Sequence, residues 1–181
     1  FPVDPPLSSL PPKPRMHFGN HTVDRVNWYD ACAFCHWLGV RLGFEVRLPT
    51  EFEWQYAAAS GDPAFTYPWG AEWDPATEPW RANTFESDLG RSTAVGMYPA
   101  GASPAGLMDM AGTVWEWCLN LFEKPDVTDF STSDGLRVLR GGSWYSGQDF
   151  ARSANRGRNY PLNRDNDFGF RVVCSFPSSG H

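Results

Sequence analysis

The stretch that decides the fold is GGSWYSGQDFARSANRGRNYPLNRDNDFGFRVV, residues 141–173. It combines two kinds of residue. One kind is typical of a structural role and consists of paired glycines, spaced arginines and large rings. Its members are Gly141, Gly142, Ser143, Trp144, Arg152, Arg156, Gly169 and Phe170. Between them lies a polar and aromatic series with neither the 3.6-residue period of a helix nor the alternation of a strand. Such a series inside a core-forming segment indicates two separate tasks, one structural and one at the surface.

The composition is that of a globular protein rich in rings and chain breakers. The chain has 181 residues, 41% of them hydrophobic and 20% charged, which suffices for one domain with a sizeable core. Nine Trp and 13 Phe stand beside 17 Gly and 16 Pro, which predicts short elements, long loops and aromatic packing. Six of the first 16 residues are Pro, so we predict an extended lead-in over residues 1–16 and one domain over residues 17–181.

Charge and hydropathy argue against two classes of partner. Residues 137–171 carry seven Arg and three Asp, a net charge of +4 within a chain whose total is −6. This segment has no Lys, and its Arg residues stand among glycines and rings, which is typical of guanidinium groups that clamp a fold. We therefore expect no nucleic-acid binding. No apolar run approaches the ~20 residues of a membrane helix, so we expect no membrane insertion, and the sequence leaves the localisation open.

The first half of the domain predicts two helices. A cap of Asn27 and Asp30 begins the first helix, which Gly43 ends. The second helix begins with a capping box at Thr50 and ends at Gly61. The apolar stripe of the first helix consists of Ala31, Phe34, Cys35, Leu38 and Leu42, and the inward residues of the second are Trp54, Ala57 and Ala58.

Short strands and one long irregular segment make up the rest. We predict strands over residues 44–48, 114–117 and 136–144, and a last strand over residues 168–176. Residues 60–105 are dense in Pro, Gly and Trp, so we expect them to pack through their own aromatic side chains. The predicted class is α+β, with two helices, short antiparallel strands and long loops.

The four cysteines do not form a recognisable metal site. Cys32 and Cys35 have the spacing of half a zinc site, but no second CxxC and no His pair completes it. Buried free thiols are the default expectation. A bridge between Cys118 and Cys174 is the alternative if the compartment is oxidising.

Six motifs, in order, identify a family. They are RLPTEFEWQYAAAS, YPWG, GLMDMAGTVWEWC, RGGSW, ARSANR and GFRVV, spread over residues 47–173. Together they resemble the formylglycine-generating-enzyme, or sulfatase-modifying-factor, domain. The resemblance implies a C-type lectin-like fold of that subtype over most of the chain.

The same resemblance bears on catalysis. It implies that catalytic members carry a cysteine pair soon after the RGGS motif, where thiolates hold copper and engage a substrate cysteine. This chain has no cysteine between Cys118 and Cys174. We therefore expect no enzyme activity and no required cofactor. A copper oxidase of the formylglycine-generating type, or a related enzyme, is the disfavoured alternative.

The C-terminal segment is also similar to the variable region of proteins that retroelements diversify, in which adenines of a template are copied unfaithfully. This resemblance implies a variable region at about residues 140–173. The positions implied to vary and to bind a ligand are Tyr145, Ser146, Gly147, Asp149, Phe150, Gly157, Asn159, Tyr160, Leu162, Asp165, Asn166, Asp167 and Phe168. The positions implied to form the scaffold are Arg140, Gly141, Gly142, Ser143, Trp144, Arg152, Arg156, Gly169 and Phe170.

The residue types at the implied variable positions suit recognition. Gly, Ser and Asn provide adaptable hydrogen bonds, and Tyr and Phe provide contact area at low entropy cost, as in antibody loops. We therefore expect a receptor-type binding protein with a macromolecular partner, a protein by preference. The alternative for the same residues is an ordinary polar surface loop.

Two further hypotheses come from other parts of the chain. The resemblance implies a structural calcium ion held by Asn83, the Thr84 carbonyl and Asp88. The Pro-rich lead-in suggests an accessory domain attached to a kinase or another signalling module.

Overall fold

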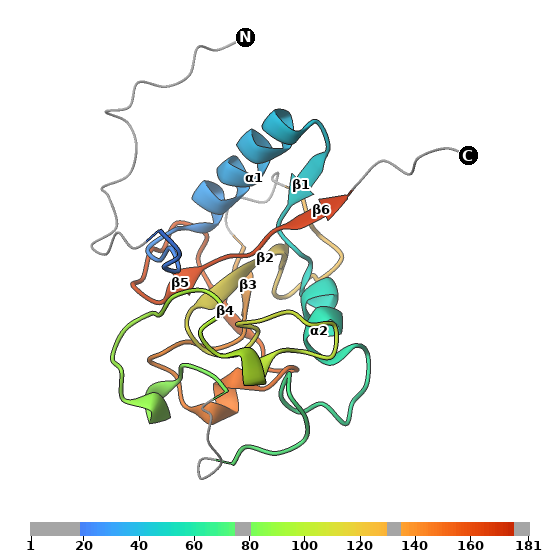
Figure 1. Cartoon of the computed structure of the whole chain (residues 1–181). Coiled ribbons are helices and arrows are strands. Elements are labelled where there is room, and N and C mark those ends of the chain that lie inside the picture. The colour runs from blue at the N-terminus through green and yellow to red at the C-terminus, as the bar shows by residue number, and fades with distance from the viewer. Residues whose placement is uncertain (1–18, 75–80, 130–134, 176–181) are drawn as a thin grey trace.

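The computed structural model describes residues 19–74, 81–129 and 135–175, so the predicted lead-in over residues 1–16 lies outside the described residues. The predicted α+β class is confirmed, because two helices lie beside two small sheets and long loops connect them (Figure 1). None of the described helices combines the length and the apolar character that a membrane crossing requires.

Helix α1, Trp28–Leu42, begins and ends where the sequence predicts. Asn27 Oδ1 accepts a hydrogen bond from the Asp30 backbone N–H at 2.8 Å, and Gly43 closes the helix with a φ of 75°. The predicted apolar stripe is partly wrong, since Phe34 and Leu42 are exposed. The buried residues of the helix are Trp28, Ala31, Cys32 and Cys35, and Leu38 packs against the same cluster.

Helix α2, Glu51–Ala59, has the predicted capping box. The Thr50 backbone N–H donates to Glu53 Oε2 at 2.8 Å, and the Glu53 N–H donates to Thr50 Oγ1 at 3.3 Å. The helix is closed by Ser60, with a φ of 51°, one residue earlier than predicted. Its inward side chains are Trp54 and Ala58, which are buried, and Ala57, which packs against them.

In the described part of the chain, six strands form the two sheets. They are β1 (Glu45–Arg47), β2 (Trp115–Leu121), β3 (Arg137–Arg140), β4 (Gly157–Asn159), β5 (Phe168–Gly169) and β6 (Val173–Ser175). β1 pairs antiparallel with β6, and the larger sheet has the order β4-β3-β2-β5, with β5 parallel to β2.

The predicted last strand over residues 168–176 is wrong, because it is divided between the two sheets. β5 belongs to the larger sheet and β6 to the smaller one. Between them Arg171 leaves the ladder, and its guanidinium donates to Glu116 Oε1 at 2.8 Å. The buried carboxylate of Glu116 therefore requires the bend that separates the two strands.

Among the described residues, three clusters of buried side chains form the core. The first is centred on Trp28 and Trp117 between α1 and the sheets, and the second on Trp54 beneath α2. The third lies under the long loop, where the rings of Tyr67 and Trp69 stack with centroids 5.2 Å apart. The prediction that residues 60–105 pack through their own aromatics is confirmed for the described part of that loop.

The described cysteines are all free thiols. Cys118 is buried in the Trp54 cluster, whereas Cys174 packs against the Trp28 cluster. The alternative of a Cys118–Cys174 bridge is therefore not what the structure contains.

Candidate recognition surface

Arg140 anchors the backbone of the predicted variable region from inside. Its side chain is fully buried at the end of β3. The guanidinium donates to the carbonyl oxygens of Ser153 at 3.1 Å and Ala154 at 3.0 Å, and also to that of Asn155. Because these acceptors are main-chain atoms, the clamp does not depend on which side chains follow.

The glycine pair after Arg140 permits a close turn. Gly141 and Gly142 have φ angles of 92° and 72°, which only glycine adopts without strain. A Cβ on Gly142 would lie 3.0 Å from the Phe150 carbonyl oxygen. The pair therefore brings the following loop, residues 145–150, back against the end of β3.

A short 3₁₀ helix, η2 (Phe85–Ser87), holds that loop from the other side. The Phe85 N–H donates to the Ser146 carbonyl oxygen at 3.0 Å, and Glu86 Oε1 accepts from the Gln148 N–H at 2.8 Å. The loop then forms a second 3₁₀ helix, η4 (Gln148–Ala151). The contacts from η2 again involve main-chain atoms of the loop.

The return segment after β4 is held in the same way. The Trp28 N–H donates to the Pro161 carbonyl oxygen at 3.1 Å, and the Arg25 N–H to that of Asp165 at 3.1 Å. The Trp115 N–H donates to the carbonyl oxygen of Asp167 at 2.7 Å. Residues outside the predicted variable set therefore fix the segment along its length.

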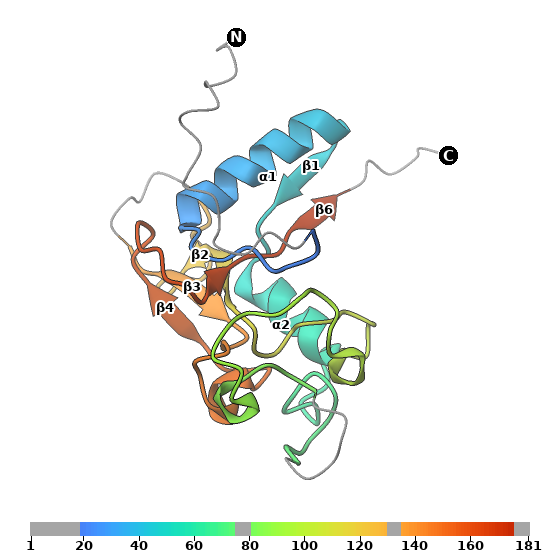
Figure 2. The same ribbon diagram turned by 60° about the vertical axis from the view of Figure 1, so that its left-hand side comes forward.

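On this frame, four large side chains point into solvent. The exposed fractions are 70% for Tyr145, 51% for Phe150, 59% for Tyr160 and 71% for Leu162. Asp149, Asp165 and Asn166 are exposed as well. The segment runs along the side of the molecule that carries β4, with η4 at its lower end (Figure 2). We call the exposed side chains of residues 145–167 the recognition surface.

Several predicted variable positions are enclosed by neighbouring side chains and cannot accept a different residue without disturbing them. Phe168 is buried, and its ring meets that of Trp117 edge-on at 5.4 Å, so its placement at the surface is wrong. Gly157 lies against Trp115, where a Cβ would approach the ring to 2.8 Å. Both positions belong to the frame, because a different side chain would disturb the packing of the buried Trp117 ring or of the half-buried Trp115 ring.

Three further positions, Ser146, Asn159 and Asp167, are half-buried and hydrogen-bonded. Ser143 Oγ donates to Asp167 Oδ2 at 2.7 Å, and Asn159 Oδ1 accepts from the Tyr160 N–H at 2.8 Å. Burial raises the pKa of Asp167, and the hydrogen bond from Ser143 opposes that rise. Gly147 is also half-buried and close to Glu86.

The predicted scaffold arginines differ from one another. Arg156 donates to Glu51 Oε1 at 2.9 Å and to the Phe122 carbonyl oxygen at 2.9 Å, as a clamp would. Arg152 is exposed and pairs with the exposed carboxylate of Asp149 at 2.7 Å, so this predicted scaffold position lies at the surface and is not a buried clamp. The remaining scaffold residues are buried (Gly141, Gly142, Ser143, Gly169) or half-buried (Trp144, Phe170).

Sequence reasoning missed the residue at the centre of this arrangement, Trp115. Its Nε1–H donates to Ser146 Oγ at 3.1 Å, and its ring meets Phe150 edge-on at 6.1 Å. Gly157 lies against the same ring. The VWEW motif predicts a strand, but it does not show which of its rings supports the recognition surface. No signal in the sequence linked η2 to that surface either.

Three of the four thiols are buried, which disfavours the thiolate form that nucleophilic or copper chemistry requires. Burial raises the pKa of Cys32 to about 12 and that of Cys35 to about 11, and it raises the pKa of Cys118 well above the ordinary value. Within the described ranges, no group of three or more His, Cys, Asp or Glu side chains could hold a metal ion.

The implied calcium ligands lie together around η2, but their oxygens have other partners. Asn83 is buried, and its Oδ1 accepts from Ser87 Oγ at 2.9 Å. The Thr84 carbonyl oxygen accepts from the same hydroxyl at 2.7 Å, while Asp88 is exposed. A cation at this place would compete with the Ser87 hydroxyl for these oxygens, and the implied calcium site stays a prediction.

Comparison with known sequences gives a family match over most of the chain. The family described as sulfatase-modifying factor enzyme 1-like domain matches residues 11–176. The serine/threonine-protein kinase pkn1 of Chlamydia pneumoniae is 39% identical over 165 residues, which are 86% of this chain and 24% of the kinase. The formylglycine-generating enzyme of Streptomyces coelicolor is 35% identical over 172 residues, 85% of this chain and 52% of the enzyme.

Not every relative is named as active. The inactive C-alpha-formylglycine-generating enzyme 2 of Bos taurus is 35% identical over 161 residues, 83% of this chain and 49% of that protein. The chain thus spans between about a quarter and about a half of these relatives. The family contains both active and inactive members.

Solved structures confirm the C-type lectin-like fold and the resemblance to variable proteins. Treponema denticola variable protein 1 superposes with a TM-score of 0.72 at 26% identity, covering 95% of this chain and 77% of that one. PvdO from Pseudomonas aeruginosa superposes with a TM-score of 0.74 at 26% identity, covering 91% of this chain and 66% of PvdO. The P3c variant of Major Tropism Determinant, at 17% identity, shares the fold.

Proposed function

The chain belongs to the sulfatase-modifying factor enzyme 1-like family, and we propose that within this family it is a non-catalytic binding protein. Its recognition surface contacts a macromolecular partner, preferably a protein, and retroelement-type diversification changes the side chains that make the contact. Treponema denticola variable protein 1, to which the chain is similar, supports this assignment.

The observation that carries the proposal is a separation of roles along one segment. Hydrogen bonds from the Arg140 guanidinium, from η2 and from Trp115 to main-chain atoms hold the backbone, while Tyr145, Phe150 and Tyr160 extend into solvent. Such a frame tolerates changes of exposed side chains without loss of the fold. A surface of this modest size derives its affinity from a few ring anchors.

Sequencing the gene in a population tests diversification directly. We expect substitutions at the codons of Tyr145, Asp149, Tyr160 and Leu162, confined to adenines of a template, and a near-copy of the codons for residues 140–171 beside a reverse transcriptase gene. The codons of buried residues such as Arg140 serve as the internal control. Substitutions spread evenly over buried and exposed codons would contradict the proposal.

A triple variant separates recognition from folding. Replacing Tyr145, Phe150 and Tyr160 together with Ser should shift the melting temperature by no more than about 3 °C, because exposed side chains contribute little to stability. Binding to a partner isolated with the wild-type chain should be abolished. A large fall of the melting temperature would mean that these rings belong to the core.

A second candidate is a recognition module within a longer signalling protein. The match to the Chlamydia kinase, which covers about a quarter of that kinase, supports it. The sequence of the complete gene tests this candidate. A kinase catalytic domain should be joined to this chain if the candidate is right. This candidate leaves the recognition surface with the same binding role.

A further inference from the structure

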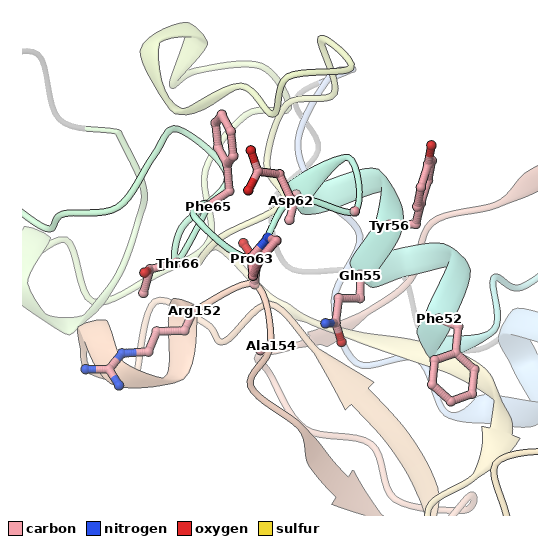
Figure 3. Close-up of a pocket in the computed structure, with 12 residues that line it drawn as sticks. Phe52, Gln55, Tyr56, Asp62, Pro63, Phe65, Thr66, Arg152 and Ala154 are labelled. Carbon is pink, nitrogen blue, oxygen red and sulfur yellow. The ribbon is translucent and has the colours of Figure 1, made fainter.

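A cavity of about 440 Å³ lies between α2 and two loop segments, residues 61–66 and 152–154 (Figure 3). Its volume is in the range of small-molecule sites. The cavity borders the recognition surface at Arg152, but no predicted variable position lines it. It is therefore a separate feature of the fold.

Aromatic rings border the cavity. Phe52 and Tyr56 are four residues apart on α2, so they lie on one face of the helix, and both are more than half exposed. The Tyr56 ring lies over Gly61, where a Cβ would come within 3.0 Å of it. Phe65, on the loop after α2, also lines the cavity (Figure 3). These rings offer apolar surface against which a flat apolar group can pack.

Hydrogen-bond donors are available in the wall. Gln55 Oε1 accepts from Arg140 Nη2 at 2.6 Å, and because Arg only donates, this contact fixes which end of the carboxamide faces away. The free end is the Gln55 NH₂ group, which has no partner among the described residues. The Ser153 hydroxyl in the same wall also lacks a partner in the described part of the chain, although Ser153 is only 2% exposed.

The charge behind this wall is positive. Arg140 is fully buried, and its hydrogen bonds go to Gln55 and to carbonyl oxygens, with no ion pair to any described carboxylate. Glu51, a nearby acid, is already paired with Arg156. A buried cation without a counter-ion produces a positive potential in the adjoining cavity. Asp62, the acid at the rim, is exposed to solvent, which screens its charge.

We propose that this cavity binds a small aromatic carboxylate. The ring packs against the aromatic side chains that line the cavity, and the carboxylate accepts from the Gln55 NH₂ group, whose other end is held by Arg140. A carboxylate fits because it is compact, planar and an acceptor at both oxygens. The inference does not depend on the proposed recognition function, since it uses a different set of side chains.

Titration calorimetry of the intact chain with three probes tests the ligand class. Phenylacetate carries both features, phenylacetamide lacks the charge, and acetate lacks the ring. We expect phenylacetate to bind at least tenfold more tightly than either of the others. Equal affinity for phenylacetate and phenylacetamide, or no saturable binding of phenylacetate, would overturn the proposal.

A variant of Gln55 tests the site without risk to the fold. Gln55→Glu places a carboxylate against Arg140, which keeps the buried contact but removes the NH₂ donor and neutralises the positive charge. We expect at least a tenfold loss of phenylacetate affinity with an unchanged or raised melting temperature. Asn20→Asp adds the same charge at an exposed position that lines neither the cavity nor the recognition surface, and this variant should bind phenylacetate like the wild type. Unchanged affinity in Gln55→Glu would refute the site.

Discussion

Two aromatic residues of the C-terminal segment illustrate how burial decides the effect of a substitution. Phe168 is buried against Trp117, whereas Tyr160 is 59% exposed. We expect Phe168→Ser to lower the free energy of unfolding by about 3 kcal/mol or more, since it removes a ring and leaves a cavity. Tyr160→Ser should change it by less than about 0.5 kcal/mol. Urea unfolding monitored by tryptophan fluorescence measures both, and similar losses in the two variants would contradict the assignment.

A glycine shows the same distinction without any change of polarity. A Cβ on Gly157 would lie 2.8 Å from the Trp115 ring, so we expect Gly157→Ala to cost about 1–3 kcal/mol through overpacking. Gly19→Ala is the control, because no atom lies within 4 Å of a Cβ there. Thermal melting compares the stability of the two variants. An unchanged melting temperature of Gly157→Ala would mean that position 157 can vary after all.

At the scale of elements, the start of α2 is sensitive to pH. The Arg47 guanidinium, 2.6 Å from Glu53 Oε1, and the Thr50 N–H lower the pKa of Glu53 from 4.5 to about 2. Because the folded-state pKa is depressed, the carboxylate stabilises the protein fully above about pH 4.5, and this contribution is lost as the pH falls toward 2.

Unfolding free energies of the wild type and Glu53→Gln, measured between pH 2 and 6, test this linkage between protonation and stability. The difference between the two proteins should be largest near pH 6 and should shrink toward pH 2. Arg47→Met should remove the same pH-dependent part of the unfolding free energy. The double variant Arg47→Met/Glu53→Gln should lose little more of it than either single variant. A difference that does not change with pH would show that the ion pair has no such role.

The elements also show which local signals in a sequence suffice. The caps at Asn27 and Thr50 were predictable because each involves residues only three apart. The division between β5 and β6 was not, because it depends on the contact of Arg171 with Glu116, 55 residues away. β4, with the sequence Gly-Arg-Asn, has low strand propensity and exists because β3 pairs with it.

At the scale of the whole molecule, the sequence predicted the composition of the recognition surface but not its limits. The residue types at Tyr145 and Tyr160 indicated contact chemistry, and both side chains are exposed. Whether a given position faces solvent depends on tertiary contacts, which is why Phe168 was misplaced and why the support from η2 was missed. Arginine spacing was equally ambiguous, since Arg140 is buried and Arg152 is exposed.

The whole chain can finally be tested for the chemistry of its active relatives. Incubation with copper and a peptide containing CxPxR, followed by mass spectrometry, should show no conversion of the peptide cysteine to an aldehyde. The physical reason is that Cys32, Cys35 and Cys118 are buried thiols with raised pKa values, and no cysteine lies between Cys118 and Cys174 to hold copper at the surface. The Streptomyces coelicolor enzyme serves as the positive control. Conversion by this chain would mean that another group supplies the reactive centre, and the assignment as a binding protein would have to be withdrawn.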